Sequence, residues 1–275
     1  MFTKINLTRL KETFSSLKST LKIKGLQTDV VILDFNKAFD TVPHDKLLHK
    51  LETYGVRGAL LRWIESFLCN RHMKVLVEGE ASSETTVDSG VPKGTGLGPH
   101  LFLVLINDLP DSVKSSVKLF AYDCLLFRII RTIHDHLTLQ EDLIQLEKWA
   151  TDWGMRFNSK KCYILSINKK SSYFYQLNGT ILQHVDKNPY LGLLISNDLK
   201  WASRINKICK KASSILGLMR RNVSNCRKTA YISLVRSSLE YGSSIWDPHL
   251  QKDIDKLEAI QRRAARFITQ DYHYY

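Results

Sequence analysis

Two short apolar segments, far apart along the chain, each lead directly to an aspartate. Val30–Leu33 ends at Asp34, and Leu119–Ala121 leads to Tyr122 and Asp123. Their short length and their content of Val, Ile, Leu and Phe predict buried strands. Neighbouring strands can hold carboxylates close together, which is how a two-metal phosphoryl-transfer site supplies hard oxygen ligands to divalent cations. A lone aspartate after an apolar run is more often an ordinary strand end, so the pair alone leaves both interpretations open.

Tyr122 stands where a two-metal site would need a second, adjacent carboxylate. A phenol, with an ordinary pKa of about 10, carries no charge at neutral pH, and Mg²⁺ strongly prefers carboxylate oxygen. Loss of one such ligand predicts a rate about a thousandfold lower, or roughly 4 kcal/mol in activation free energy. Asp123 is not expected to take over the role, because adjacent strand residues point to opposite faces of a sheet.

The chain is strongly basic, since 40 Lys and Arg against 27 Asp and Glu give a formal net charge of +13. The excess is concentrated between Lys200 and Thr269, where 15 basic and five acidic residues give +10. An uneven positive charge of this kind predicts a nucleic-acid partner, bound through its phosphate backbone. A basic protein without such a partner is the alternative that charge alone leaves open.

Five cysteines, at positions 69, 124, 162, 209 and 226, are widely spaced and include no C-x-x-C pair. This pattern argues against a zinc site or a disulfide framework and favours a reducing compartment. Residues 1–20 lack the apolar segment of a signal peptide, and no stretch of sequence reaches the roughly 18 apolar residues of a membrane span. We therefore expect an intracellular protein of the nucleus or cytoplasm, not secreted and without a membrane partner.

Hydrophobic periodicity divides the chain into two parts. In the first part the pattern predicts helices at 5–23, from Asp45 onward, at 60–68, at 101–107 and from Asp135 to Trp153. It also predicts strands at 28–35, 117–121 and 124–130, and a hairpin of 74–78 with 85–87. Asp45 is expected to cap its helix, and residues 122–123 are expected to connect the last two strands. From about residue 200 the pattern predicts three amphipathic helices. The fold class is therefore α+β, an antiparallel sheet with packed helices followed by a small helical bundle.

Five segments, taken in order, resemble the motifs of one known family. They are Val31–His44, Ser89–Pro99, Phe120–Asp123, Asn158–Cys162 and Tyr190–Gly192. They are similar to the first to fifth palm motifs of the reverse transcriptases of non-LTR (LINE-type, jockey-like) retrotransposons. The family usually has Gln at the position of Lys93 and has Asp at the position of Tyr122. The joint match runs from about residue 24 to the C-terminus, and it is far more specific than any one segment.

The resemblance implies a polymerase palm at residues 25–199 and a basic, thumb-like helical region at 200–275. Residues 1–24 are then an N-terminal helical remnant, because the fingers region that relatives carry before the first motif is expected to be lacking. The chain is expected to be an internal fragment of a retrotransposon polyprotein. The implied activity is RNA-directed DNA polymerase, the Mg²⁺-dependent addition of deoxynucleoside triphosphates to a DNA primer on an RNA template. It is expected to be impaired in this copy by Tyr122 and the absent fingers.

The resemblance also implies roles for individual residues. Asp34 and Asp123 would be catalytic metal ligands, Lys161 would protonate the departing pyrophosphate, and Tyr122 occupies a degenerate ligand position. The nucleotide would contact Phe35, Phe39 and Gly94, with Phe39 as the gate against a ribose 2′-hydroxyl, and template and primer would contact Pro92, Lys93, Tyr190, Leu191 and Gly192. The alternatives are a core Phe39, a solvated Lys161 and a packed turn residue at Tyr190. Asp40 is expected to be a cap or an ion-pair partner rather than a ligand.

Basic residues follow helical spacing in the last quarter of the chain. The predicted set is Arg204, Lys207, Lys210, Lys211, Arg220 and Arg221. Because acidic partners at i+4 are scarce, these charges are not neutralised locally, which favours contact with a nucleic-acid backbone over a merely solvated helix face. A non-catalytic nucleic-acid-binding remnant of a transposable element, and a chain without a cellular role, are the alternatives to a polymerase.

Overall fold

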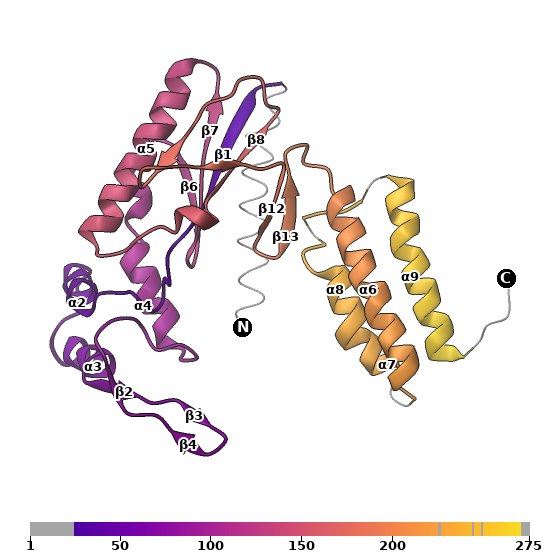
Figure 1. The fold of residues 1–275 in the computed structure, drawn as a ribbon, viewed down its shortest axis with the longest axis horizontal. Helices are drawn as coiled ribbons and strands as arrows, with labels where there is room; N and C mark the ends of the chain where they lie inside the picture. Colours follow the sequence, from indigo (N-terminus) through magenta and orange to yellow (C-terminus); the bar gives the residue numbers. More distant parts are fainter. Residues whose placement is uncertain (1–24, 225–226, 244, 249, 271–275) are drawn as a thin grey trace. The chain divides into compact units, whose positions relative to one another are not determined.

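The computed structural model describes residues 25–224, 227–243, 245–248 and 250–270, which form two compact units (Figure 1). We call residues 25–185 the sheet unit and the described residues from 186 onward the helical unit. The sequence predicted a boundary near residue 200. The chain divides earlier, because the hairpin of β12 (Lys187–Tyr190) and β13 (Leu193–Ser196) packs against the helix α6 (Ala202–Asn222) that follows it. The helix predicted at 5–23 and the N-terminal remnant lie outside the described residues.

A five-stranded sheet organises the sheet unit, in the order β11-β8-β1-β7-β6. Its strands are β1 (Gln27–Asp34), β6 (Ser116–Phe120), β7 (Asp123–Ile130), β8 (Tyr163–Ile167) and β11 (Gln183–His184). The central strand β1 pairs antiparallel with both β7 and β8, whereas β11 runs parallel to β8. Residues 27–33 are all buried, as expected of an apolar strand covered on both faces. The predicted strand at 28–35 and the largely antiparallel sheet are confirmed.

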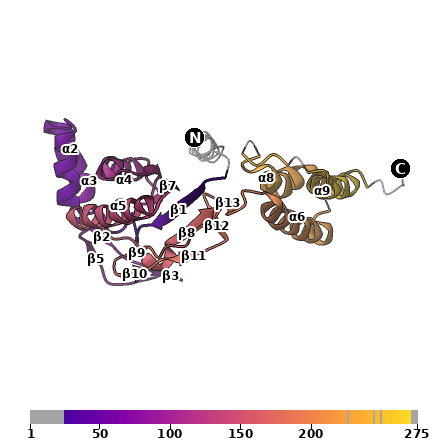
Figure 2. The same ribbon diagram turned by 90° about the horizontal axis from the view of Figure 1, so that it is seen from above.

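Helices cover one face of this sheet. The helices of the sheet unit are α2 (His44–Thr53), α3 (Gly58–Leu68), α4 (Leu97–Ile106) and α5 (Ile133–Asp152). α4 and α5 lie side by side (Figures 1 and 2), and their Leu105 and Leu143 share one hydrophobic core with Val31 and Leu33 of β1. Shorter elements are 3₁₀ turns at Leu109–Ser112 and Ser159–Lys161 and the pair β9 (Gln176–Leu177) with β10 (Thr180–Ile181).

The hairpin after α3 has a different register from the predicted one. The outer pair is β2 (Arg71–Met73) with β5 (Thr85–Val87), and the inner pair is β3 (Leu76–Val77) with β4 (Glu80–Ala81). The chain reverses at Glu78 and Gly79, which have φ values of +52° and +93°. Positive φ at both central residues is the requirement of a tight two-residue hairpin turn, so the turn geometry fixes this register.

Two predicted element boundaries shift by one or two residues. Pro43 rather than Asp45 stands at the N-cap of α2, and Asp45 lies in the first turn, where a carboxylate suits the helix dipole. The tight connection between β6 and β7 consists of Ala121 and Tyr122, with φ of +48° at Ala121. Asp123 is therefore the first residue of β7 rather than part of the turn.

The helical unit contains the predicted bundle. α6 packs against α9 (Gln251–Thr269), and between them the chain forms α7 (Arg227–Ala230), a π-helical stretch at Tyr231–Arg236 and α8 (Ser237–Glu240). Ile205 and Ala212 of α6 and Ile260 and Ala264 of α9 are buried, as the apolar spacing predicted. Among the described helices, none combines the length and the apolar character that crossing a membrane requires.

Candidate active site

The sheet register brings the two predicted carboxylates together. Asp34 is the last residue of β1, Asp123 is the first residue of β7, and the two are direct partners in the antiparallel ladder. Opposed residues of an antiparallel pair point to the same face of the sheet, with Cβ atoms about 5 Å apart. The separation of 89 positions in sequence is thus closed by strand pairing. The pairing register of β1 with β7 places Asp123, rather than Tyr122, opposite Asp34.

The pKa values of both carboxylates are raised above the ordinary aspartate value. Burial, followed by the negative charge of Asp34, raises the pKa of Asp123 to about 6. Burial also raises the pKa of Asp34, and the positive charge of Lys161 opposes that rise. The ammonium nitrogen Nζ of Lys161 lies 3.8 Å from Oδ2 of Asp34. Lys161 is therefore beside the carboxylates, as the resemblance implied, although its side chain is largely exposed.

Tyr122 lies next to both carboxylates. Its pKa is raised by burial and then by the charges of Asp123 and Asp34, so the phenol stays neutral at neutral pH. The side chain is 41% exposed, and its ring meets the ring of Phe39 edge-on at a centroid distance of 5.8 Å. An aromatic ring thus occupies space beside the carboxylate pair, where a negative third ligand would complete a metal site.

Within the described part of the chain, no group of three or more His, Cys, Asp or Glu side chains could hold a metal ion. The backbone of Asp34 contacts a thiol and a second main-chain group: its N–H faces the sulfur of Cys162 at 3.5 Å, and its carbonyl accepts from the N–H of Asn158 at 2.8 Å. Burial raises the pKa of Cys162 to about 11, so this thiol stays protonated and offers no charge.

The two phenylalanines of the first motif have different surroundings. Phe35 is 3% exposed and stacks on Phe157 with ring centroids 4.4 Å apart, so its side chain belongs to the hydrophobic core. This burial corrects the expectation that Phe35 contacts a nucleotide. Phe39 is only partly buried and packs against Phe102 at 4.9 Å. It remains available at the edge of the carboxylate site.

The second-motif loop is bound to the first motif. The N–H of Val91 donates to the carbonyl of Phe39 at 2.8 Å, and a Cβ added to Gly90 would lie 2.7 Å from that same oxygen, so only glycine fits this approach. Lys93 forms an ion pair with Asp40 at 2.7 Å, which confirms Asp40 as an ion-pair partner. We call the adjoining space of about 640 Å³ the Phe39 cavity, because it is bordered by Phe39, Asp40, Arg71, His72, Met73 and residues 86–93.

Gly94 and Pro92 belong to the same second-motif loop, Ser89–Pro99. Gly94 has a φ of +79° with open space around its Cβ position, and Pro92 borders the Phe39 cavity together with Lys93. Three residues predicted to contact nucleotide or template therefore lie in one exposed loop. No sequence pattern had indicated Arg71 or His72, which border this cavity from β2.

The turn between β12 and β13 is packed inside the helical unit. Tyr190 is 2% exposed, which favours the alternative of a packed turn residue. The hydroxyl of Tyr241 donates to the carbonyl of Leu191 at 3.0 Å. A Cβ on Gly192 would lie 3.1 Å from the ring of Tyr241. The carbonyl oxygens of Leu191 and Gly192 are thus both engaged within the helical unit, by Tyr241 and by Arg204.

Arg204 does not belong to the exposed basic face. It is 4% exposed, and its guanidinium donates to the carbonyls of Gly192 at 2.8 Å and Tyr241 at 2.9 Å. Burial lowers the pKa of Arg204 to about 10, which still leaves it charged at neutral pH. The helical spacing placed Arg204 with its basic neighbours, but it lies on the buried side of the first turn of α6, where it binds the hairpin turn to the helices.

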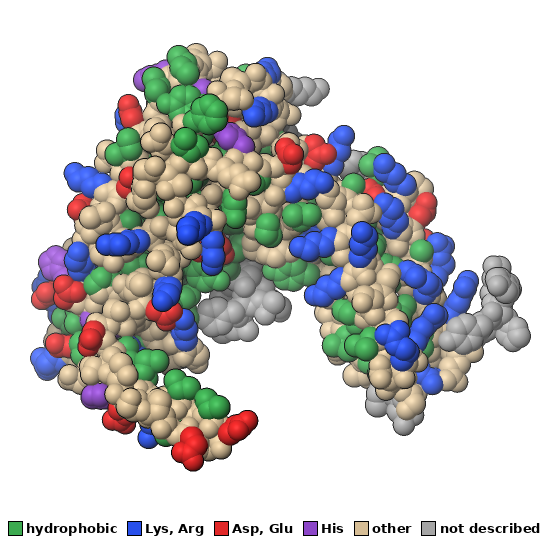
Figure 3. Space-filling view, in the orientation of Figure 1, with side chains coloured by type: hydrophobic (Ala, Val, Ile, Leu, Met, Phe, Trp, Pro, Cys, Tyr) green, Lys and Arg blue, Asp and Glu red, His purple; other side chains and the backbone are tan. Residues whose placement is uncertain are grey.

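The other basic residues of the predicted set are exposed. They are Lys207, Lys210, Lys211, Arg220 and Arg221, all on α6. α6 carries no acidic residue, and no ion pair is formed by these five side chains within the described part of the chain. Figure 3 shows Lys and Arg side chains gathered over the helical unit. We call these five residues the α6 basic face.

Comparisons with known proteins agree with this geometry. A family model described as reverse transcriptase (RNA-dependent DNA polymerase) matches residues 5–195. The RNA-directed DNA polymerase from mobile element jockey of Drosophila melanogaster is 27% identical over 255 residues, which cover 86% of this chain and 28% of that protein. The probable RNA-directed DNA polymerase from transposon BS of the same species is 26% identical over 273 residues, covering 90% and 29%. The chain thus spans less than a third of the length of these curated relatives.

The fold is also similar to that of solved structures. The structure of telomerase from Candida tropicalis in complex with a TWJ fragment of telomeric RNA matches with a TM-score of 0.54 at 12% identity. The match covers 96% of this chain and 43% of that one. At this identity the likeness concerns the fold alone, and it supports the mixed arrangement of helices and antiparallel sheet described above.

Proposed function

Since the chain belongs to the reverse transcriptase (RNA-dependent DNA polymerase) family, we propose that it is the polymerase domain of a non-LTR retrotransposon in which Tyr122 impairs nucleotidyl transfer. The reaction would add deoxynucleotides to a DNA primer on an RNA template. The observation that carries the proposal is the pairing of Asp34 with Asp123 at the end of two neighbouring strands, with Tyr122 beside them.

The carboxylate pair supports weak binding of a single Mg²⁺ ion. Asp34 and Asp123 would hold it, and the negative charge of Asp34 adds to burial in raising the pKa of Asp123. Such an ion would supply positive charge to an attacking 3′-hydroxyl and to the phosphate. Tyr122 contributes no charge and fills space, which lowers the expected affinity for a second ion. The impairment follows from this donor set.

Lys161 and Phe39 would act on the substrate. The ammonium group of Lys161, 3.8 Å from the carboxylate of Asp34, is placed to donate a proton to a departing pyrophosphate. Phe39 borders a cavity of about 640 Å³ and would exclude a ribose 2′-hydroxyl by its size. Gly94 would permit close approach of a nucleotide, while Pro92 and Lys93 would contact the template strand. Lys93 must first exchange its ion pair with Asp40.

Template and primer would be held mainly by charge. The α6 basic face, Lys207, Lys210, Lys211, Arg220 and Arg221, presents five cations on a helix without acidic residues. Phosphate backbones bind such faces by releasing condensed counterions, which makes binding salt-dependent. The relatives are named as RNA-directed polymerases, which supports an RNA template for this chain. The turn at Leu191 and Gly192 would contact the primer.

Primer extension on an RNA template tests the proposal. The unchanged chain should extend a DNA primer slowly with Mg²⁺, and Tyr122→Asp should raise the rate by up to about a thousandfold, because it restores a charged ligand and removes the ring. Tyr122→Phe is the matched control, since it keeps the ring and removes only the hydroxyl, and it should leave the rate low. Fast extension by the unchanged chain would contradict the impairment, and equal rates for all three proteins would contradict the assignment of the site.

A second function, non-catalytic binding of nucleic acid, is favoured by the same α6 basic face. In that case duplex binding should be independent of Mg²⁺ and should weaken steeply as salt rises. Binding measured by fluorescence anisotropy, with and without chelator, distinguishes the two, because a polymerase site should add a Mg²⁺-dependent component when nucleotide is present. Absence of binding even at low salt would overturn this second function.

A further inference from the structure

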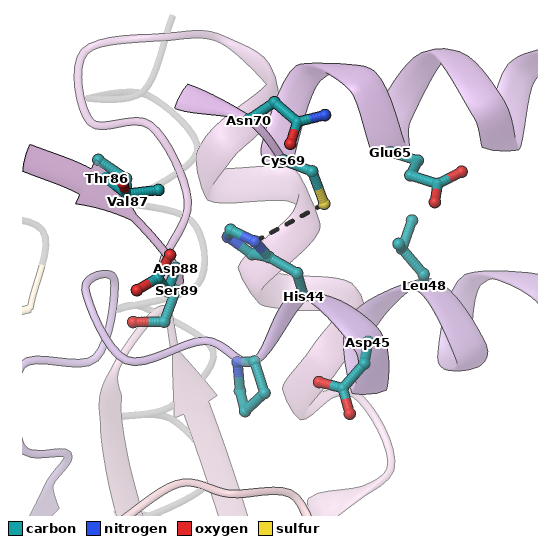
Figure 4. Close-up of a pocket in the computed structure, with 11 residues that line it drawn as sticks. His44, Asp45, Leu48, Glu65, Cys69, Asn70, Thr86, Val87, Asp88 and Ser89 are labelled. Atoms are coloured by element: carbon teal, nitrogen blue, oxygen red, sulfur yellow. Dashed lines mark hydrogen bonds between the residues drawn. The ribbon is translucent and has the colours of Figure 1, made fainter. Parts of the chain in front are cut away.

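The sheet unit has another cavity, of about 570 Å³, which shares only residues 86–89 with the Phe39 cavity (Figure 4). It lies between the start of α2, the end of α3 and strand β5. Two reactive side chains meet there: Cys69, which follows α3, and His44, the first residue of α2. Neither has a role in the proposed polymerase site.

The ring of His44 is oriented by a hydrogen bond from its Nε2 nitrogen. Its Nε2 lies 2.8 Å from the carbonyl oxygen of Gly90, and a carbonyl can only accept, so Nε2 carries the proton. In the neutral ring Nδ1 is therefore the acceptor, and it faces the sulfur of Cys69 at 3.9 Å. His44 is 8% exposed, so this orientation is fixed by packing as well as by the hydrogen bond. A base and a thiol thus stand together at the edge of a cavity large enough for a small molecule.

We propose that Cys69 is a thiol-modification site, activated by His44, for small uncharged conjugated carbonyl compounds. In the addition, the sulfur of Cys69 forms a bond to the β-carbon of the alkene while the carbon–carbon π bond breaks. The thiol proton passes to Nδ1 of His44 and then to the α-carbon of the adduct. No atom is lost and no electron acceptor is needed. The cavity receives the body of the adduct.

The other described cysteines lack this arrangement. Cys124 is 0% exposed and Cys162 is 1% exposed, and burial raises the pKa of both thiols. Cys209 is partly exposed, and burial raises its pKa as well. Among the four described cysteines, a histidine nitrogen faces the sulfur of Cys69 alone. Cys209 is therefore the internal reference for a partly exposed thiol that no histidine nitrogen faces.

Charge around the cavity selects among electrophiles. Asp45, Glu65 and Asp88 border it, and all three are exposed. Their carboxylates repel an anionic reagent. An uncharged or cationic electrophile should therefore react faster than an anionic one with the same reactive group.

The first test follows adduct formation on the full chain with N-ethylmaleimide, by peptide mass spectrometry over time. Cys69 should react at least about tenfold faster than Cys209, and His44→Gln should slow Cys69 by about tenfold or more. The glutamine amide can still donate to Gly90, so the loop contact is kept while the base is lost. Cys209 should react at an unchanged rate in this variant. Equal rates at the two cysteines, or an unchanged Cys69 rate in His44→Gln, would overturn the proposal.

The second test does not depend on the folding of His44→Gln. N-ethylmaleimide is compared with 3-maleimidopropionate, which has the same reactive group and a carboxylate, at low salt. The preference of Cys69 for the neutral reagent should exceed that of 2-mercaptoethanol by at least about twofold, and Asp88→Asn should reduce it. Circular dichroism confirms that each variant is folded. A preference equal to that of the free thiol would count against the cavity as the reacting site.

Discussion

Replacing Asp123 with asparagine should stabilise the sheet unit at neutral pH while removing a proposed metal ligand. The pKa of Asp123 is raised to about 6, first by burial and then by Asp34. Because the folded-state pKa lies above the ordinary value of 3.8, the folded protein holds this proton more tightly than the unfolded chain. The stabilisation is complete below the unfolded pKa and is lost as pH rises through about 6. Asparagine stays neutral and is free of this loss.

The size of the expected stabilisation follows from the pKa shift of Asp123. A rise from 3.8 to about 6 corresponds to about 3 kcal/mol between the two protonation states. Asp123 is partly exposed, so solvent screening reduces this to about 2 kcal/mol. Asp123→Asn should therefore gain about 2 kcal/mol at pH 8, or roughly 4 to 8 °C in melting temperature for a unit of this size. At pH 4 the gain should be well under about 1 kcal/mol.

Urea unfolding with a chelator present measures this difference, because a bound cation would mask the repulsion. Asp111→Asn, at an exposed aspartate outside the site, is the matched control and should change stability by less than about 0.5 kcal/mol at either pH. A variant no more stable than its parent at pH 8 would refute the reasoning. So would a gain of equal size at both pH values, since that would come from packing rather than charge.

Arg204→Met should destabilise the helical unit by about 3 kcal/mol in urea unfolding, because it removes the two hydrogen bonds of a buried, charged guanidinium to the carbonyls of Gly192 and Tyr241. Lys207→Met, at an exposed position of the same helix, should cost less than about 0.5 kcal/mol, and similar losses for the two variants would contradict the buried role of Arg204. Gly90→Ala should lower the free energy of unfolding by at least about 2 kcal/mol, because residue 90 has a φ of +89° and the added Cβ would lie 2.7 Å from the carbonyl oxygen of Phe39. Gly94→Ala is the matched control: its φ is also positive, but there is open space around the added Cβ, so it should cost only about 1 kcal/mol. Lys207→Gln and Lys210→Gln should each reduce the steepness of the plot of log binding constant against log salt concentration by about 1, as measured by filter binding of nucleic acid. An unchanged slope would show that the substituted lysine does not contact the phosphate backbone.

Local elements and motif positions could be predicted from the sequence. The apolar run before Asp34 gave a buried strand, and periodic apolar residues gave the helices of both units. These patterns succeed because burial of side chains follows the repeat of the backbone itself, 2 residues in a strand and about 3.6 in a helix. The ordered motifs likewise predicted that Asp123 and Lys161 would lie near Asp34.

Pairing and packing partners were decided only when the chain folded. Whether Tyr122 or Asp123 stands opposite Asp34 depends on the pairing register of β1 with β7, two strands far apart in sequence. Helical spacing placed Arg204 among exposed cations, but its guanidinium is buried against a hairpin turn. The contact of His44 with the thiol of its cavity follows from no periodic pattern at all. A repeat fixes which side of its own element a residue occupies, whereas the neighbour on that side comes from distant segments whose register and packing are settled by the whole chain.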